Sequence, residues 1–568
     1  MPALMRALRR RGRESLMNRR ALIFFTACVM LVAACGAPQP ASPALSTDAA
    51  VQPAADRART LILAMPSLPT NLDPGVATSG AENMLHRALY EGLVNFKGSS
   101  TTEVEPVLAE SFEANADQSV WTFKLRRGVK FTDGADFNAE AAKMGYLRMV
   151  DIGLLGNTIN RFTGGDPVNN LIVKDEYTLE WRCGFSCPNL PQALGTAYGT
   201  LFVSPKAMKA HEQVADGKSD YAQAWFANNA AGTGPYMVES IKPNEEIVFV
   251  RNPNYWRGWN DGKQRFERII IRNVPEPSTR RQLLEKGDAD IALISTVEDY
   301  KALRETGRFQ GSDKPLFRIN YITFTKRGVL VDPRVRQAIS YAFDYDGYAN
   351  NVEGGLMKRG TSPWPSGMSS AVGTRGFQYT FDLDKAKALL QEAGVPPGTE
   401  LTYLYATGYG YYERMGQVLQ AGLEQIGLKL KLEERDEATF NDIFYGSRPV
   451  EELPDLMGYA WWPDYDDFYN YVNPVFHTRN DQNDGLGNGA LYSNAELDAL
   501  IEQSKTETDP AKLKAIYERA HQILMFEDPA GLYAAEPQEE ILIANSVKGH
   551  PWNPIHVKTF DFYGLYRE

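Results

Sequence analysis

Strand and helix patterns alternate along most of this chain, and this alternation constrains its fold more than any other feature. Residues 278–294 predict a capped helix, a stop at Gly287 and a buried strand, and residues 413–433 predict a helix followed by a strand with leucine at every second position. Further helices are expected after Asp332 and from Asp382 to Gly394. No repeat of fixed period is present, which argues against a solenoid or a propeller. The predicted class is therefore α/β.

The N-terminus has the features of an export signal. Seven arginines precede an apolar run from Ala21 to Val32, which is too short to span a bilayer comfortably, and small residues follow it. The ending Ala33-Ala34-Cys35 is similar to a lipobox, which implies that Cys35 becomes the lipidated first residue of the mature protein. Arg19-Arg20 hints at twin-arginine export, but the rest of that motif is missing.

We therefore predict a lipoprotein signal peptide over residues 1–35. The following segment, residues 36–57, is rich in Ala, Pro, Ser and Gln and has no apolar period, as expected for a flexible tether. The rest of the chain is long enough for two or three domains, and no later apolar run is long enough to cross a bilayer.

The charge of the chain argues against a nucleic-acid partner. The net charge is −11, and removal of the signal, which carries seven Arg and one Glu, makes the mature chain more acidic still. A phosphate backbone repels such a protein, and no basic stripe is present. Two cysteines, Cys183 and Cys187, remain outside the signal. In an oxidising compartment they are expected to form a disulfide, and a zinc site is the weaker alternative because no further ligands lie nearby.

Familiar catalytic motifs are missing from the sequence. It contains no HExxH, no GxSxG and no GxxxxGK[ST], and its six histidines are scattered. We therefore expect no catalytic residues, no metal and no cofactor. The acidic pair Asp464 and Asp466 leaves a secreted hydrolase open as an alternative.

Residues 457–471 have the composition of a ligand pocket. Fifteen positions hold seven aromatic residues and three carboxylates, although aromatic residues are 11% of the whole chain. Flat rings offer contact surfaces for a bound molecule, and a carboxylate offers a fixed charge. The alternative is a buried aromatic strand followed by a solvated acidic turn.

Several stretches, in a fixed order, resemble the extracellular solute-binding proteins of family 5, the peptide, opine and nickel cluster that serves ABC importers. The resemblance covers nearly all of the mature chain. The stretches are 72–74, 90–93, 106–112, 121–134, 232–236, 252–256, 332–343 and 384–394.

The resemblance implies a two-lobed fold of the periplasmic-binding-protein type, class II, with an extra subdomain inserted in lobe I and a ligand between the lobes. By analogy, lobe I comprises residues 58–320 and 536–568, with the inserted subdomain at about 100–200, and lobe II comprises residues 321–535. The implied partners are a peptide or other small solute, an ABC permease and a membrane reached through the lipid anchor. We expect a monomer.

The resemblance also implies a role for individual residues. The motif Trp461-Trp462-Pro463-Asp464-Tyr465 matches one in which the aspartate pairs with the α-ammonium group of a peptide. The alternative for Asp464 is a helix N-cap without a ligand role. The full predicted ligand-binding set is Asp464, Trp461, Trp462, Tyr459, Tyr465, Tyr321, Tyr405 and Ser79.

One departure from the family pattern concerns the carboxyl end of the ligand. Dipeptide-binding members carry an arginine before the helix that corresponds to 413–426, whereas residues 403–412 are rich in tyrosine and contain none. This argues against strict dipeptide specificity. It favours longer peptides, with oligosaccharides stacked on the tyrosines as the alternative.

Overall fold

The computed structural model describes residues 54–568 with gaps at 70, 77–79, 153–165, 197–198, 216, 295, 313, 373–377, 481–486 and 556–558. The predicted signal peptide and Cys35 lie outside these residues. Helix α2 (Ala54–Arg59) begins inside the predicted tether, and Arg57 forms an ion pair with Asp290 at 2.8 Å.

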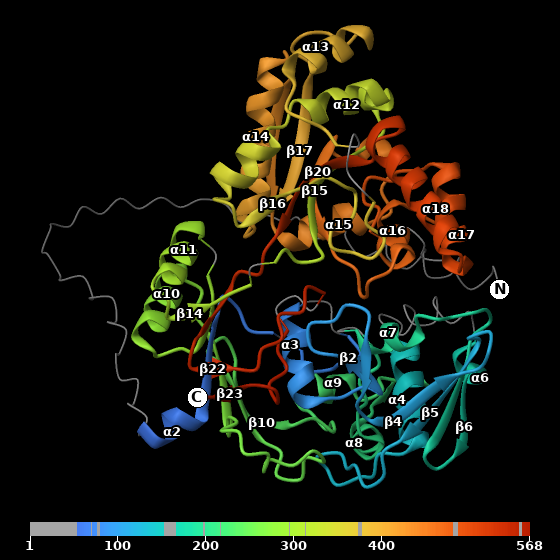
Figure 1. Cartoon of the computed structure of the whole chain (residues 1–568), viewed down its shortest axis with the longest axis vertical. Coiled ribbons are helices and arrows are strands. Elements are labelled where there is room, and N and C mark those ends of the chain that lie inside the picture. Colours follow the sequence, from blue (N-terminus) through green and yellow to red (C-terminus); the bar gives the residue numbers. More distant parts are fainter. Residues whose placement is uncertain are drawn as a thin grey trace, which may run out of the picture. The chain divides into compact units, whose positions relative to one another are not determined.

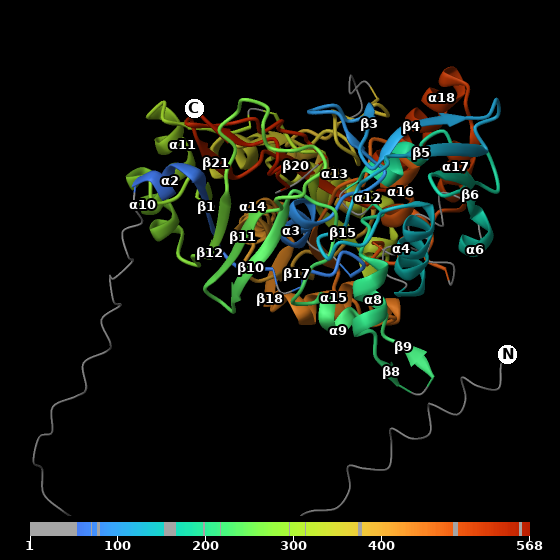
Figure 2. The same ribbon diagram turned by 90° about the horizontal axis from the view of Figure 1, so that it is seen from below.

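Lobe I is built on a seven-stranded mixed sheet with the order β10-β11-β12-β1-β13-β21-β14. β1 pairs in parallel with β12 and β13, whereas the outer pairs are antiparallel. Figure 2 shows β1, β10, β11 and β12 side by side. The strands are β1 (Thr60–Met65), β10 (Tyr236–Lys242), β11 (Glu246–Arg251), β12 (Arg268–Asn273), β13 (Ile291–Leu293), β14 (Phe309–Gln310) and β21 (Ile541–Ala544).

A second, four-stranded antiparallel sheet has the order β4-β5-β7-β6 and comes from the part of the chain that was predicted to hold the inserted subdomain of lobe I. Its strands are β4 (Ala109–Ala114), β5 (Val120–Leu125), β6 (Leu171–Asp175) and β7 (Thr178–Arg182). The chain forms a separate hairpin, β2 (Val94–Phe96) and β3 (Val104–Pro106), just before β4. The helices of lobe I are α3 (Gly80–Leu89), α4 (Ala139–Ile152), α6 (Pro167–Asn170), α7 (Leu190–Gly195), α8 (Pro205–His211), α9 (Gln223–Phe226), α10 (Pro277–Lys286) and α11 (Val297–Glu305). Short pairs are β8 (Val214–Ala215) with β9 (Lys218–Ser219) and β22 (Val547–Lys548) with β23 (Tyr566–Arg567).

Lobe II is built on a six-stranded sheet with the order β16-β20-β15-β19-β17-β18. Helices α12 to α18 surround it (Figure 1). The strands are β15 (Ile319–Phe324), β16 (Met357–Arg359), β17 (Glu400–Ala406), β18 (Lys429–Arg435), β19 (Leu456–Trp461) and β20 (Gly531–Pro537). The helices are α12 (Pro333–Tyr341), α13 (Leu383–Glu392), α14 (Gly410–Gln425), α15 (Glu437–Tyr445), α16 (Phe468–Phe476), α17 (Ala495–Thr506) and α18 (Pro510–Gln522).

Helix caps in the sequence set several of these boundaries. Asp332 accepts a hydrogen bond from the backbone N–H of Arg334 at the start of α12, and Asp382 does the same for Lys385 at the start of α13. Gly287, at the end of α10, has a φ of 79°, a conformation that glycine adopts at little cost. These features confirm the predicted α/β pattern.

Candidate functional site

The aromatic segment forms the end of one strand, a turn and the start of a helix. β19 ends at Trp461, residues 462–467 form the turn, and α16 begins at Phe468. β15 pairs with β19, so that Tyr321 lies opposite Tyr459, and β15 pairs with β20, so that Tyr321 also lies opposite Tyr533. Residues from three parts of the chain therefore meet beside the turn.

Tyr459, Tyr321 and Tyr533 form a row of rings across three neighbouring strands, which we call the tyrosine row. The ring of Tyr321 lies 5.9 Å from that of Tyr459 and 6.0 Å from that of Tyr533. All three side chains are buried. Burial raises the pKa of Tyr321 well above its usual value, so its hydroxyl stays protonated as a hydrogen-bond donor.

Several polar atoms of this region have no hydrogen-bond partner among the residues that the structure describes. They are the hydroxyls of Tyr321, Tyr533 and Tyr471 and the indole nitrogen of Trp461, all of them buried. An unsatisfied buried donor costs about 1–3 kcal/mol. The concentration of such donors beside one turn indicates a polar surface made for a ligand or for bound water.

Asn470 holds Asp464 at two points. The backbone N–H of Asp464 donates to Asn470 Oδ1 at 2.7 Å, and Asn470 Nδ2 donates to Asp464 Oδ2 at 3.2 Å. The N-cap of α16 is Asp467, whose Oδ1 accepts from the backbone N–H of Asn470 at 2.8 Å. Asp464 is therefore not the helix cap, and the half-buried carboxylate keeps a fixed position in the turn.

The other two carboxylates of the turn reach side chains of lobe I. Thr101 Oγ1 donates to Asp466 Oδ2 at 3.1 Å, and Asn189 Nδ2 donates to Asp467 Oδ2 at 3.1 Å. Burial raises the pKa of Asp466 and raises that of Asp467 to about 6. The turn that carries Asp464 is thus part of the contact between the lobes.

The remaining predicted residues lie in different places. Tyr465 is buried beside the turn, where burial raises its pKa. Tyr405 lies on β17 and stacks on Tyr403, with a ring separation of 5.7 Å. Because β17 is separated from β15 by β19, Tyr405 is not part of the tyrosine row. Ser79 lies outside the described residues.

Two residues of this region, Tyr533 and Arg318, lie outside the candidate set that the sequence predicts, whereas Tyr471 lies in the aromatic segment 457–471. Tyr533 and Tyr471 bring their hydroxyls to the site from β20 and α16. Arg318, immediately before β15, lies over the ring of Trp462, with its guanidinium carbon 5.8 Å from the ring centre. The available sequence signal for Arg318 was a basic residue just before the predicted boundary between the lobes at residue 320. No signal from neighbouring residues marks Tyr533.

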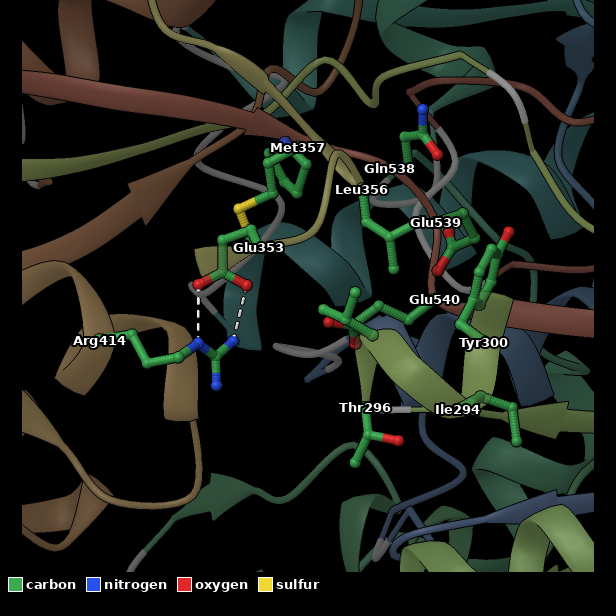
Figure 3. A pocket seen from close by; sticks show the side chains of 12 residues that line it. Ile294, Thr296, Tyr300, Glu353, Leu356, Met357, Arg414, Gln538, Glu539 and Glu540 are labelled. Atoms are coloured by element: carbon green, nitrogen blue, oxygen red, sulfur yellow. Dashed lines mark hydrogen bonds and ion pairs between the residues drawn. The ribbon is translucent and has the colours of Figure 1, made fainter. Parts of the chain in front are cut away.

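A small cavity lies where β13 and α11 of lobe I approach the segment around β16 of lobe II. Arg414 donates two hydrogen bonds to Glu353 on one side of it, at 2.8 and 2.7 Å, and Thr296 lies on the other (Figure 3). Its volume of about 20 Å³ is room for about one water molecule. This cavity is too small to hold a peptide or a sugar.

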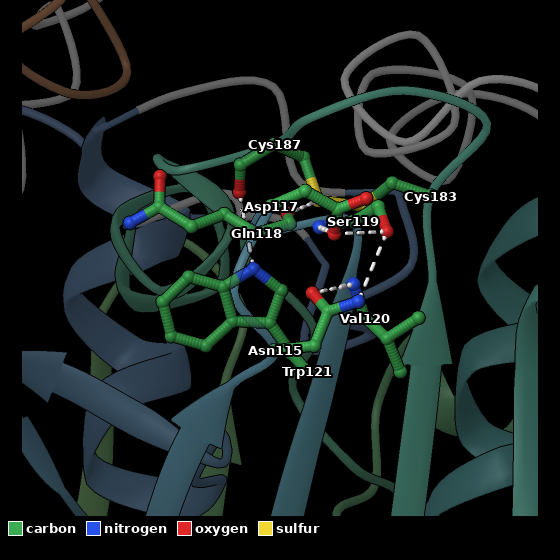
Figure 4. The surroundings of a disulfide bond; sticks show 8 residues. All are labelled: Asn115, Asp117, Gln118, Ser119, Val120, Trp121, Cys183 and Cys187. Atoms are coloured by element: carbon green, nitrogen blue, oxygen red, sulfur yellow. Dashed lines mark hydrogen bonds between the residues drawn. A yellow bond between two sulfur atoms is a disulfide. The ribbon is translucent and has the colours of Figure 1, made fainter.

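The cysteines lie directly after β7 of the four-stranded sheet. Cys183 and Cys187 form a disulfide, and Trp121 Nε1 donates to the carbonyl oxygen of Cys187 at 3.2 Å (Figure 4). The backbone N–H groups of both cysteines donate to carbonyls of the β4–β5 loop, on Ser119 and Gln118. These hydrogen bonds therefore hold the end of β7 and the disulfide loop against the β4–β5 loop.

Two further features are missing from the described residues. No group of three or more His, Cys, Asp or Glu side chains in this part of the chain is placed to hold a metal ion. No helix in the same residues is long and apolar enough to cross a membrane.

Residues 103–483 match the family model described as bacterial extracellular solute-binding proteins, family 5. The chain is 30% identical to a probable D,D-dipeptide-binding periplasmic protein, DdpA, of Escherichia coli K12, over 91% of this chain and 96% of that protein. It is 26% identical to the di/tripeptide-binding protein 2 of Pseudomonas aeruginosa, again over 91% of this chain and 96% of that one.

Two solved structures have the same fold. The Helicobacter pylori binding protein DppA in complex with the peptide STSA superposes with a TM-score of 0.73 at 21% identity, over 90% of this chain and 98% of that one. The Haemophilus influenzae OppA complex with RPPGFSPFR gives a TM-score of 0.72 at 20% identity, over 90% and 99%.

Proposed function

Since the chain belongs to the bacterial extracellular solute-binding proteins of family 5, which serve ABC importers, we propose that it captures an oligopeptide-like solute between its two lobes. The solute passes unchanged to a membrane permease. Residues 58–320 and 536–568 form lobe I in this proposal, and residues 321–535 form lobe II. A solute that binds the closed form better than the open form drives closure by that difference in affinity.

The placement of Asp464 is the observation that carries the proposal. A half-buried carboxylate, fixed by Asn470 in a turn that also contacts lobe I, suits a cation that arrives with the solute. The α-ammonium group of a peptide supplies that cation together with directional N–H donors. Trp461, Trp462 and the tyrosine row supply flat surfaces and unsatisfied donors for the rest of the chain.

Peptides are also the solutes named for the two relatives described above. A D,D-dipeptide is named for the Escherichia coli protein and di- and tripeptides for the Pseudomonas protein. The tyrosine row keeps a neutral oligosaccharide as the second candidate, because sugar faces stack on aromatic rings. A hydrolase that uses Asp464 and Asp466 is the weakest candidate, because Asp466 already accepts hydrogen bonds from Ser369 and Thr101.

Calorimetric titration with short peptides and with neutral oligosaccharides tests the proposal, and mass spectrometry of each mixture after incubation tests for turnover. We expect saturable binding of peptides and full recovery of intact peptide. Binding of sugars alone would promote the second candidate. Cleavage products would show that the protein is an enzyme.

We further propose that the protein is exported and held at the membrane by a lipid on Cys35, and that it acts as a monomer. The similarity of Ala33-Ala34-Cys35 to a lipobox supports the anchor. Cys35→Ser should move the protein from the membrane fraction to the soluble fraction of cells. If the variant still sediments with membranes, Cys35 is not the anchor.

A further inference from the structure

A lysine of lobe II lies between two aromatic rings, one from each of the proposed lobes. Lys505 is on α17, and its Nζ lies 4.9 Å from the ring centre of Phe185 and 5.1 Å from that of Tyr469, on α16. Phe185 comes from the part of the chain that was predicted to hold the inserted subdomain of lobe I. A cation between two rings is attracted to both of them. We call Phe185, Lys505 and Tyr469 the aromatic clasp.

The disulfide restricts the position of Phe185. This residue lies inside the loop that Cys183 and Cys187 close, and the two cysteines are only four positions apart. The backbone N–H groups of both cysteines also donate to carbonyls of the β4–β5 loop (Figure 4). A closed loop this short leaves Phe185 few conformations, whereas the same segment without the bridge has many more to lose when the clasp forms. The bridge therefore orders the lobe I side of the clasp in advance.

The clasp belongs to a set of contacts that exist only when the lobes are together. Asn189, which follows the disulfide loop, donates to Asp467 of lobe II. The chain also crosses between the lobes beside the hydrogen bond from the backbone N–H of Leu316 to the carbonyl oxygen of Pro537, but an open form keeps these covalent connections. Contacts between side chains of different lobes are lost when the lobes separate. The clasp thus stabilises the closed form relative to the open form.

We propose that the disulfide is a redox switch for closure: reduction of the Cys183–Cys187 bond loosens the aromatic clasp and shifts the protein toward its open form. A dithiol supplies the two electrons and two protons. Its thiolate attacks one sulfur of the bridge to form a mixed disulfide, and its second thiol then displaces the protein, which keeps two thiols while the dithiol becomes a cyclic disulfide. Cys183 is half-buried beside the exposed Gly184, which makes this end of the bridge the one that a dithiol reaches.

Reduction should loosen closure without unfolding the protein. A disulfide that closes so short a loop adds little to global stability, so the melting temperature should barely change. Loss of a cation–ring contact at a partly exposed site should change the ratio of closed to open protein by about three- to tenfold.

Small-angle scattering of the solute-free protein, oxidised and after reduction with dithiothreitol, tests the proposal. The reduced wild type should have the larger radius of gyration, and the double variant Cys183→Ser with Cys187→Ser should have that radius under both conditions. Lys505→Met should already be more open than the wild type when oxidised. Reduction should change Lys505→Met less than it changes the wild type, because its clasp has lost the cation.

Lys514→Met is the matched control, since Lys514 is an exposed lysine of the same lobe that forms an ion pair with Glu518 of its own helix. It should keep the radius and the redox response of the wild type. An equal radius for the oxidised and the reduced wild type, with the reduction verified by mass spectrometry, would overturn the proposal. So would an equal response of the wild type and Lys505→Met, since the disulfide would then act without the clasp. No solute is used in these measurements, so their outcome is independent of the proposed peptide capture.

Discussion

Replacement of Tyr321 by phenylalanine should weaken the binding of the solute without lowering the stability of the folded protein. The hydroxyl of Tyr321 is buried in the tyrosine row and has no hydrogen-bond partner within the described residues. Removal of an unsatisfied hydroxyl with the ring retained costs the folded protein nothing or stabilises it. If that hydroxyl donates to the solute, the variant loses about 1–2 kcal/mol of binding, a five- to thirtyfold weaker affinity.

Tyr403→Phe is the matched control, on β17 of the same sheet. Tyr403 is fully buried, and its hydroxyl donates to the carbonyl oxygen of Tyr412 at 2.8 Å. Its removal deletes a buried hydrogen bond and should cost about 0.5–1.5 kcal/mol of unfolding free energy, while affinity stays the same.

Urea unfolding of the solute-free proteins and calorimetric titration with the bound peptide measure both quantities for Tyr321→Phe and Tyr403→Phe. We expect the first variant to lose affinity alone and the second to lose stability alone. A Tyr321→Phe protein that is destabilised as much as Tyr403→Phe and binds normally would refute the reasoning, because the hydroxyl would then have a structural partner.

Three further predictions concern the turn after β19. Asp464→Asn should weaken the binding of a peptide by about 2–5 kcal/mol but barely change the unfolding free energy. If the wild type binds a peptide with a free α-amino group and the same peptide with an acetylated amino group equally well in titration, this prediction is contradicted. Asp467 has a pKa raised to about 6, so its contribution to stability is present below its unfolded pKa of about 4 and is lost as the pH rises through 6. Unfolding curves from pH 4 to 7 should therefore show the wild type losing about 1–2 kcal/mol relative to Asp467→Asn, and parallel curves would count against it. Asn189→Ala removes a hydrogen bond between the lobes, so small-angle scattering of the solute-free protein should show a larger radius of gyration than the wild type, and an unchanged radius would mean that this contact does not favour closure.

Features that depend on neighbouring residues in the sequence were predictable. The caps Asp332 and Asp382 and the stop at Gly287 each act within one helical turn, and the structure has them as expected. The disulfide between Cys183 and Cys187 closes a loop short enough to be read from spacing. The two-lobed architecture was predicted from the order of the family motifs. The periodicity of apolar residues alone does not predict it.

Features that depend on strand register were not predictable. Tyr533 lies beside Tyr321 only because β20 pairs with β15 across more than two hundred residues of sequence. The three aspartates of the turn look equivalent in the sequence, yet Asp467 caps α16, Asp466 reaches Thr101 and Asp464 is held by Asn470. Their separate roles follow from the geometry of the turn, and the ligand role of Asp464 stays a prediction.

Mass spectrometry of the solute that co-purifies with the protein, released by mild denaturation, tests peptide capture most directly. The account predicts an intact peptide with a free amino end, since Asp464 supplies the opposite charge. A neutral oligosaccharide, a metal chelate or a peptide blocked at both ends would contradict it.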